Sequence, residues 1–117
     1  MDGGHRIRSS ELGGITIGGD VVAQIVGHTA AECYGIVGMA GKGLKRLLTR
    51  DRLTQGIGVS SRGEALAIDL HVIVEYGLNL AEVAAAVRSR VAYEVERLTG
   101  LPVAAVEVHI EDVRRSA

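Results

Sequence analysis

Hydrophobic positions in the first third of the chain predict a short strand followed by an amphipathic helix. Residues 14–18, GITIG, are typical of a strand, and Asp20 stands where an N-cap accepts from the first free amides of a helix. Apolar residues then recur at helical spacing, in a stripe formed by Val22, Ile25, Val26, Thr29, Ala30 and Cys33. The stripe predicts one buried helix face, and Gly35 is placed to end the helix in a left-handed conformation.

The middle of the chain changes from a helical period to a period of two. A leucine-bearing run, LKRLLTRDRL, predicts a short amphipathic helix over residues 44–54. From Gly56 onwards apolar and polar residues alternate, first in GIGVSS and then, after the turn SRGE, in LAIDLHVIVEY. The inward positions of this segment are Ile57, Val59, Ile68, Leu70, Val72, Val74 and Tyr76. Such alternation predicts a β-hairpin with one buried face.

The last third predicts a long capped helix and a final strand. Asn79 and Glu82 have the spacing of a capping box, and Gly100 and Pro102 punctuate the end of the helix. Its apolar stripe is Leu80, Val83, Ala84, Val87, Val91, Val95 and Leu98. The final strand alternates Ala104, Val106, Val108 and Ile110 with Glu107, His109 and Glu111. One face of this strand is therefore expected to be polar.

Together these elements predict an α+β fold with the order β-α-(short α)-β-β-α-β. Each strand offers a single apolar face, so the economical arrangement is a mixed β-sheet with its helices packed on one face. A chain of 117 residues is enough for one domain with one modest core. We expect a flexible N-terminal segment at 1–11, a single domain at 12–113 and a tail at 114–117.

Composition limits the location and the partners of the chain. No apolar run approaches the roughly 20 residues that span a bilayer, and the N-terminus lacks the apolar core of a secretory signal. The single cysteine fits a reducing compartment, so a cytoplasmic protein is expected. A net charge of −1 means that binding to nucleic acid or anionic lipid would need a local patch.

The glycine-rich stretch GIVGMAGKGLKRLLTR, residues 35–50, is the first candidate for such a patch. It fails as a phosphate-binding G-x-x-x-x-G-K-S/T loop, because Gly43 follows Lys42 and Ile36 stands where the first glycine belongs. VGMAGKGL, at Val37–Leu44, does match the I/V-G-x-x-G-x-x-I/L loop with which KH domains clamp RNA. The residues in reach of RNA, another anion or lipid are Gly38, Gly41, Lys42, Lys45, Arg46, Arg50 and Arg52. The alternative is a solvated connection between helix and strand.

A second candidate is the polar face of the predicted sheet. Asp69, His71 and Glu75 share one strand face, and Glu107, His109 and Glu111 share another. If the two strands are neighbours, these side chains form a set able to hold a divalent ion, although the wet face of any half-buried sheet has the same pattern. No metal or cofactor is predicted on this basis. Because Cys33 lies on the core stripe and no serine has a recognisable histidine and carboxylate motif, we expect a non-enzyme.

Several longer motifs resemble a known family. IDLHVIVEYG followed directly by NLAEVA, then VERLTGLPVAAVEVHIEDV, and the loop GIVGMAG resemble the alkaline shock protein family of bacterial envelope stress response proteins, over residues 12–113. The resemblance implies a small cytoplasmic protein without known catalytic residues. It also implies self-assembly into homo-oligomers and, as in some members, peripheral placement at the inner face of the membrane through a separate small anchor protein. A scaffold or adaptor is therefore expected, with a KH-like RNA-binding module as the alternative.

Overall fold

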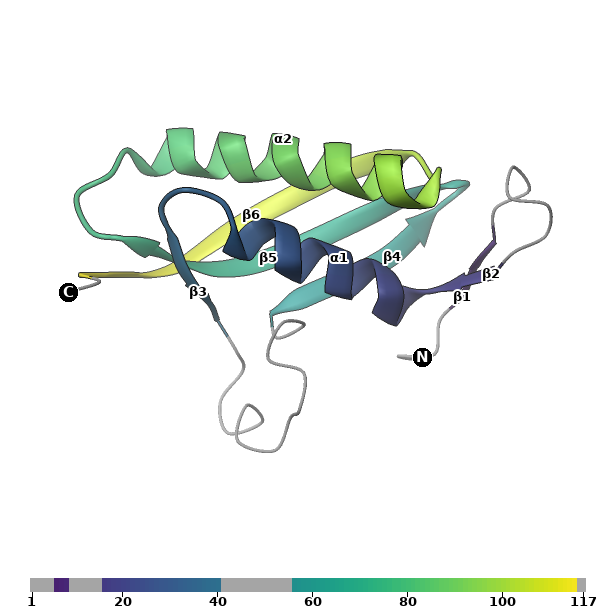
Figure 1. Ribbon diagram of the computed structural model, residues 1–117, viewed down its shortest axis with the longest axis horizontal. Coiled ribbons are helices and arrows are strands. Elements are labelled where there is room, and N and C mark those ends of the chain that lie inside the picture. The colour runs from purple at the N-terminus through teal and green to yellow at the C-terminus, as the bar shows by residue number, and fades with distance from the viewer. Residues whose placement is uncertain (1–5, 9–15, 41–55, 116–117) are drawn as a thin grey trace, which may run out of the picture.

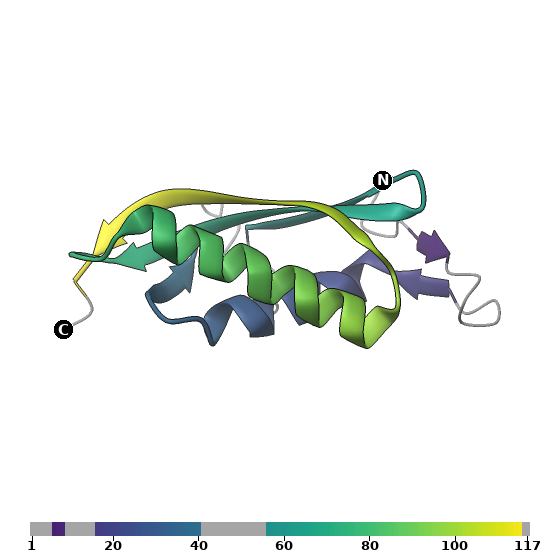
Figure 2. The same cartoon turned by 90° about the horizontal axis from the view of Figure 1, so that it is seen from above.

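The structure, a computed structural model, describes residues 6–8, 16–40 and 56–115. In chain order its elements are β1 (Arg6–Arg8), β2 (Thr16–Gly18), α1 (Gly19–Ala31), β3 (Ile36–Met39), β4 (Ile57–Arg62), β5 (Ala65–Glu75), α2 (Leu80–Thr99) and β6 (Val103–Arg114). β1 and β2 form a small antiparallel pair, and the other four strands form the main sheet. Both helices lie on one side of that sheet (Figures 1 and 2). The predicted α+β class with helices on one face is confirmed.

β5 is the central strand of the main sheet. β3 and β4 both pair with it in antiparallel fashion along one edge, β3 beside the segment 72–74 and β4 beside the segment 65–70. β6 pairs with the opposite edge in parallel fashion, after the crossover through α2. The sheet is therefore mixed, as predicted.

The core lies between β5 and the two helices. Five side chains of β5 alternate along the strand and are almost fully buried beneath the helices: Leu66, Ile68, Leu70, Val72 and Val74. α1 contributes its predicted stripe, with Val22, Val26 and Ala30 fully buried and Ile25 only partly so. Because neither helix covers the other side of the sheet, the remaining β5 residues can be polar.

Both ends of α1 differ from the prediction. The N-cap is Gly18, which makes no side-chain cap bond, and Asp20 lies within the first turn. The helix ends at Ala31 with Glu32 as its C-cap, four residues before the expected stop. Gly35, with φ of +93°, is instead the last residue of the turn before β3, where a Cβ atom would lie 2.9 Å from the Leu78 side chain. Packing of the chain against Leu78 therefore explains this glycine better than helix capping does.

α2 has the caps that were predicted. The Glu82 amide donates to Asn79 Oδ1 at 3.1 Å, and Gly100 closes the helix with a left-handed φ of +77°. The buried positions of the helix are Val83, Val87, Val91, Val95 and Thr99. They repeat every four residues, so the stripe drifts around the helix and reaches Thr99 rather than Leu98. Leu98 is 55% exposed and Leu80 is also exposed, which corrects their predicted burial.

Two further corrections concern strand ends. A register shift lies between the pairs Leu66–Val103 and Ala67–Ala105, so Ala104 is an extra, exposed residue and not part of the buried row. β5 ends at Glu75, and Tyr76, predicted to face inward, is exposed with the Arg115 guanidinium 4.5 Å from its ring centroid.

The glycine-rich stretch is partly a strand. Residues 36–39 form β3, whereas the sequence suggested a loop between two helices. The Ala40 amide donates to the His71 carbonyl, and the His71 amide donates to the Gly56 carbonyl, both at 2.8 Å. The chain thus leaves the sheet at Ala40 and returns to it at Gly56, beside the same residue of β5. The predicted helix at 44–54 lies outside the described residues.

Asn79 provides a first test of the local capping. Replacing it with alanine (Asn79→Ala) removes the acceptor for the Glu82 amide and is expected to lower the free energy of unfolding by about 1 kcal/mol. Urea denaturation followed by circular dichroism measures the change. Asn79→Ser keeps a capping oxygen and should stay close to the wild type; an equal loss in both variants would contradict the capping role.

Gly56 tests the point at which the chain returns to the sheet. A Cβ at this left-handed residue would lie 2.4 Å from the Ala40 carbonyl oxygen, whereas at Gly63, also left-handed, it would meet nothing within 4 Å. Gly56→Ala and Gly63→Ala both place a Cβ on a left-handed residue, which costs about 1–2 kcal/mol of backbone strain. Gly56→Ala should lose about 3 kcal/mol or more, because backbone atoms must also move. Thermal or urea unfolding that ranks the two variants equally would refute this close approach.

Candidate functional site on the open sheet face

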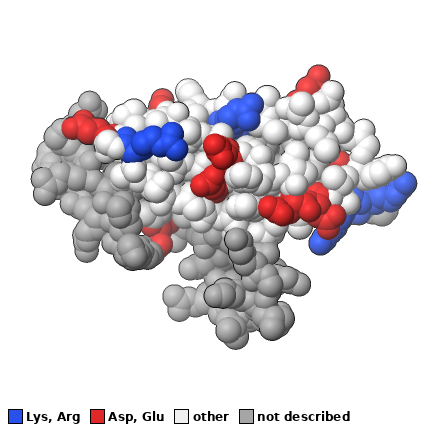
Figure 3. All heavy atoms as spheres, turned by 180° about the vertical axis from the view of Figure 1, so that it is seen from behind, with Lys and Arg blue, Asp and Glu red and all other residues white. Residues whose placement is uncertain are grey.

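The face of the sheet that points away from the helices carries the polar side chains of β5 and β6. The parallel register pairs Asp69 with Glu107 and His71 with His109. Figure 3 views the molecule from this side and shows acidic side chains gathered over the middle of the face. The two polar rows that the sequence pointed out are therefore brought side by side.

The two histidines of this face stack on each other. Their ring centroids lie 4.6 Å apart, with 14° between the ring planes. His71 Nδ1 lies 2.6 Å from Glu111 Oε2, whereas His109 Nε2 lies 3.3 Å from Asp69 Oδ1 and 3.7 Å from Glu107 Oε1. Along the two strands, the Asp69–Glu107 pair precedes the histidines and Glu111 follows them. The two stacked rings therefore contact carboxylates on opposite sides of the stack. We call Asp69, His71, Glu107, His109 and Glu111 the histidine ladder.

Glu75 does not join the histidine ladder. The register places it opposite Arg114, and Ile73 separates it from His71 along β5. Arg114 in turn binds Asp112, with Nε 3.0 Å from Oδ2. This hydrogen bond, together with one from the Val113 amide, holds the pKa of Asp112 below its usual value. The ladder is therefore bordered by an arginine at the end of β6.

Glycines border the ladder on its other side. Gly58 of β4 lies opposite Asp69, and a Cβ there would be 3.8 Å from the Asp69 Cβ.

Gly38, a predicted anion contact, lies within β3 and pairs with Ile73. It therefore does not belong to a loop between two helices, which corrects the KH-type interpretation. The other predicted contacts, Gly41, Lys42, Lys45, Arg46, Arg50 and Arg52, lie outside the described residues.

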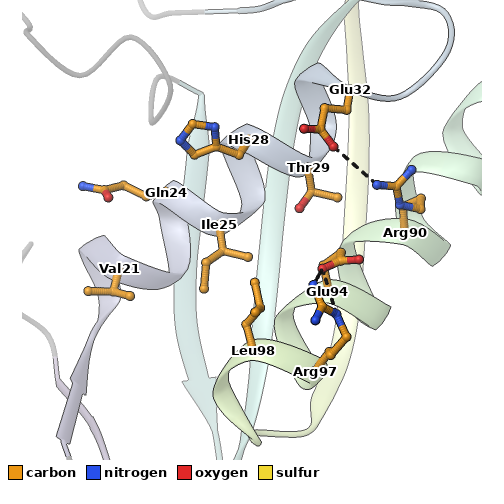
Figure 4. Close-up of a pocket in the computed structure, with 10 residues that line it drawn as sticks. All are labelled: Val21, Gln24, Ile25, His28, Thr29, Glu32, Arg90, Glu94, Arg97 and Leu98. Carbon is orange, nitrogen blue, oxygen red and sulfur yellow. Dashed lines mark hydrogen bonds and ion pairs between the residues drawn. The ribbon is translucent and has the colours of Figure 1, made fainter.

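A second surface feature was not anticipated from the sequence. Between α1 and α2 runs an open groove of about 480 Å³, shown in Figure 4. Val21, Ile25 and Leu98 supply its apolar part. Its other lining residues are Gln24, His28, Thr29, Glu32, Arg90, Glu94 and Arg97. Arg90 Nη2 lies 3.5 Å from Glu32 Oε1 across the groove. Periodicity cannot reveal such a groove, because it depends on how the helices lie against each other.

Cys33 is buried, as predicted. Its thiol donates to the Thr29 carbonyl at 3.4 Å, and burial raises the pKa of the thiol. A buried thiol with a raised pKa is a poor nucleophile.

None of the helices in the described part of the chain is both long and apolar enough to cross a membrane.

The protein has clear relatives in bacteria. The uncharacterized protein YloU of Bacillus subtilis is 38% identical over 110 residues, which are 90% of this chain and 92% of the relative. The uncharacterized protein Spy1614 of Streptococcus pyogenes is 30% identical over 105 residues, with 86% and 87% covered. A stress response regulator gls24 homolog of Streptococcus pyogenes is 28% identical over 112 residues, and this chain spans 63% of its length.

Solved structures of the MamM CTD share the fold. One matches with a TM-score of 0.51 at 12% identity and covers 89% of this chain and 98% of the other. A zinc form of that domain matches with a TM-score of 0.50 at 14% identity, covering 80% and 84%. At such low identity the likeness concerns the fold alone.

A family model matches nearly the whole chain, residues 8–115. The model describes the alkaline shock protein 23 family, with a cell envelope-related function, and the gls24 homologs among the relatives are named as stress response regulators. The expected resemblance to alkaline shock proteins is confirmed. The chain is a member of the alkaline shock protein 23 family, whose function is related to the cell envelope.

Proposed function

We propose that this protein is a non-catalytic scaffold or adaptor of the envelope stress response. It acts by self-association and by binding a membrane-anchored partner protein at the inner face of the cell membrane. The observation that carries the proposal is the outer edge of β6. Family membership gives the envelope context, and the edge gives a physical means of assembly.

β6 spans Val103–Arg114 and pairs along one side only, with β5, among the residues that the structure describes. Its middle part, residues 105–110, is in regular register with 67–72 of β5, between two register shifts. The outer side of such a strand carries backbone amides and carbonyls that pair readily with another strand. Figure 1 shows β6 running the length of the sheet. A second copy of β6 is the simplest partner for this edge.

The aromatic side chains support a role in protein binding. The chain has three tyrosines and no phenylalanine or tryptophan, and Tyr34, Tyr76 and Tyr93 are 81%, 57% and 62% exposed. The core is built without any of them. Tyrosine is enriched at protein interfaces because it offers a large apolar area and a polar tip.

Two of these tyrosines share one end of the sheet. The Glu75 amide donates a hydrogen bond to the Gly35 carbonyl, and the Tyr76 amide donates one to the Arg114 carbonyl, both at 2.8 Å. The first bond joins the residue after Tyr34 to the residue before Tyr76, so both tyrosines lie at the end of the sheet where β5 ends. Val37 and Val113, which are exposed as well, lie on β3 and β6 at the same end. We call these four residues the tyrosine end and assign to it the membrane-anchored partner.

Self-association is tested by placing charge on the β6 edge. Ala104 and Val113 are exposed and lie near opposite ends of β6. If two copies of β6 overlap over their full length, the double variant Ala104→Lys with Val113→Lys places lysine opposite lysine in both a parallel and an antiparallel pair, and like charges repel. Light scattering coupled to size exclusion should give a dimer or larger assembly for the wild type and a monomer for the variant.

The matched control is Ala85→Lys with Ala86→Lys on the exposed face of α2, which adds two lysines away from the edge. This control should assemble like the wild type. A wild type that remains monomeric at high micromolar concentration, or an edge variant that assembles as the wild type does, would count against the scaffold.

The partner is tested by affinity capture from detergent-solubilised membranes of the native host. The wild type should recover a small membrane-anchored protein, identified by mass spectrometry. Tyr34→Ser with Tyr76→Ser should reduce the recovery at least about tenfold, because aromatic side chains often carry the binding energy of an interface. Tyr93→Ser on α2 is the control and should recover the protein normally. Equal recovery by all variants would remove the tyrosine end as the docking surface.

A further inference from the structure

Three side chains of the histidine ladder have the spacing of a metal site. One ligand atom from each of Asp69, Glu107 and His109 can be chosen so that all three lie within 4.8 Å of one another. His109 Nε2 lies 3.3 Å from Asp69 Oδ1 and 3.7 Å from Glu107 Oε1. For a tetrahedral zinc site with bonds of about 2.0–2.2 Å, neighbouring ligand atoms lie about 3.3–3.6 Å apart. Both distances to the imidazole are therefore close to those of a coordinated set.

We propose that Asp69, Glu107 and His109 bind a divalent transition-metal ion, with Zn²⁺ as the best fit. This site goes beyond the scaffold function and does not depend on it. One imidazole and two carboxylates, with no thiolate, suit Zn²⁺ better than Cu⁺, and the imidazole disfavours Mg²⁺ and Ca²⁺. All three residues lie on the open face of the sheet, so the fourth coordination position is accessible to water.

Ion pairing alone accounts poorly for the arrangement around His109. Its Nε2 can carry a single proton, and one N–H donates a good hydrogen bond in one direction only. Two carboxylate oxygens nevertheless converge on this atom, at 3.3 and 3.7 Å. Asp69 and Glu107 also face each other directly across the two strands, where like charges are destabilising. A divalent cation between the three ligand atoms satisfies both carboxylates at once.

The backbone holds these ligands in place. Asp69 lies on the central strand, which is paired on both sides, and Glu107 and His109 lie two residues apart on the same face of β6. Sites built on strands are more precise than sites built on loops. Gly58, next to Asp69 on β4, leaves the carboxylate without a neighbouring side chain on the side that faces away from β6.

His71 is the neighbour that is not a ligand. It stacks on His109, but its Nδ1 lies 2.6 Å from Glu111, on the other side of the ladder from Asp69 and Glu107. We assign it a positioning role, since the stack limits the rotation of the His109 ring. Two histidines of the same face thus have different roles, which makes His71 a matched control.

The test is a competition titration of Zn²⁺ against a chromophoric chelator, with chelator-treated protein that carries no affinity tag. The wild type should bind one equivalent. His109→Ala should weaken binding by more than about 100-fold, because a ligand is lost and even loss of a partner hydrogen-bonded to a ligand typically costs about 10–100-fold, whereas His71 only stacks on His109. His71→Ala should weaken it by less than about tenfold, and His28→Ala, on the exposed face of α1, should bind like the wild type.

Circular dichroism of each variant reports whether the fold is kept. The isosteric variants Asp69→Asn and Glu107→Gln remove one ligand charge each without changing size, and both should weaken Zn²⁺ binding in the same assay even if His109→Ala fails to fold. Absence of saturable Zn²⁺ binding by the wild type overturns the proposal. So does tight binding by His109→Ala, Asp69→Asn or Glu107→Gln, or a loss in His71→Ala as large as that in His109→Ala.

Discussion

Burial of alternate β5 side chains beneath two helices is the interaction on which the rest of this structure depends. Leu66, Ile68, Leu70, Val72 and Val74 are the inner row, and the valines of α1 and α2 complete the core against them. Because a strand alternates strictly, this burial turns Asp69, His71 and Glu75 to the opposite face. A shift of register by one residue would move every aliphatic side chain of the row into water. The polar face is therefore as strongly specified as the core.

The same constraint places β6. Val106, Val108 and Ile110 align with Ile68, Leu70 and Val72 on the helix side, so Glu107 and His109 must align with Asp69 and His71 on the open side. Parallel pairing of two half-buried strands thus assembles the histidine ladder from residues about 40 positions apart in the chain. Among the described strands, the crossover through α2 leaves β6 as the last one on its side of the sheet, and this is the edge to which we assign assembly.

The proposed activities use neighbouring surfaces of one small molecule. In these proposals the β6 edge serves self-association, the tyrosine end serves the membrane-anchored partner, and the open face carries the metal site, with Val113 shared by the β6 edge and the tyrosine end. A core made of aliphatic side chains and Cys33 needs no aromatic side chain and leaves all three tyrosines on the surface.

Local patterns in the sequence determined much of this protein. The period of two along β5, the four-residue repeat of α2 and the caps at Asn79 and Gly100 all depend on residues within a few positions of one another. They sufficed to predict the α+β class, the helices on one face and the polar rows. The tertiary structure alone decided that residues 36–39 form a strand, because so short a segment becomes β3 only by bonding to β5. It alone decided that Asp69 faces Glu107 and that His71 and His109 contact different carboxylates. Register depends on backbone hydrogen bonds between distant segments, and the periodicity of a sequence does not reveal which distant residues these bonds pair.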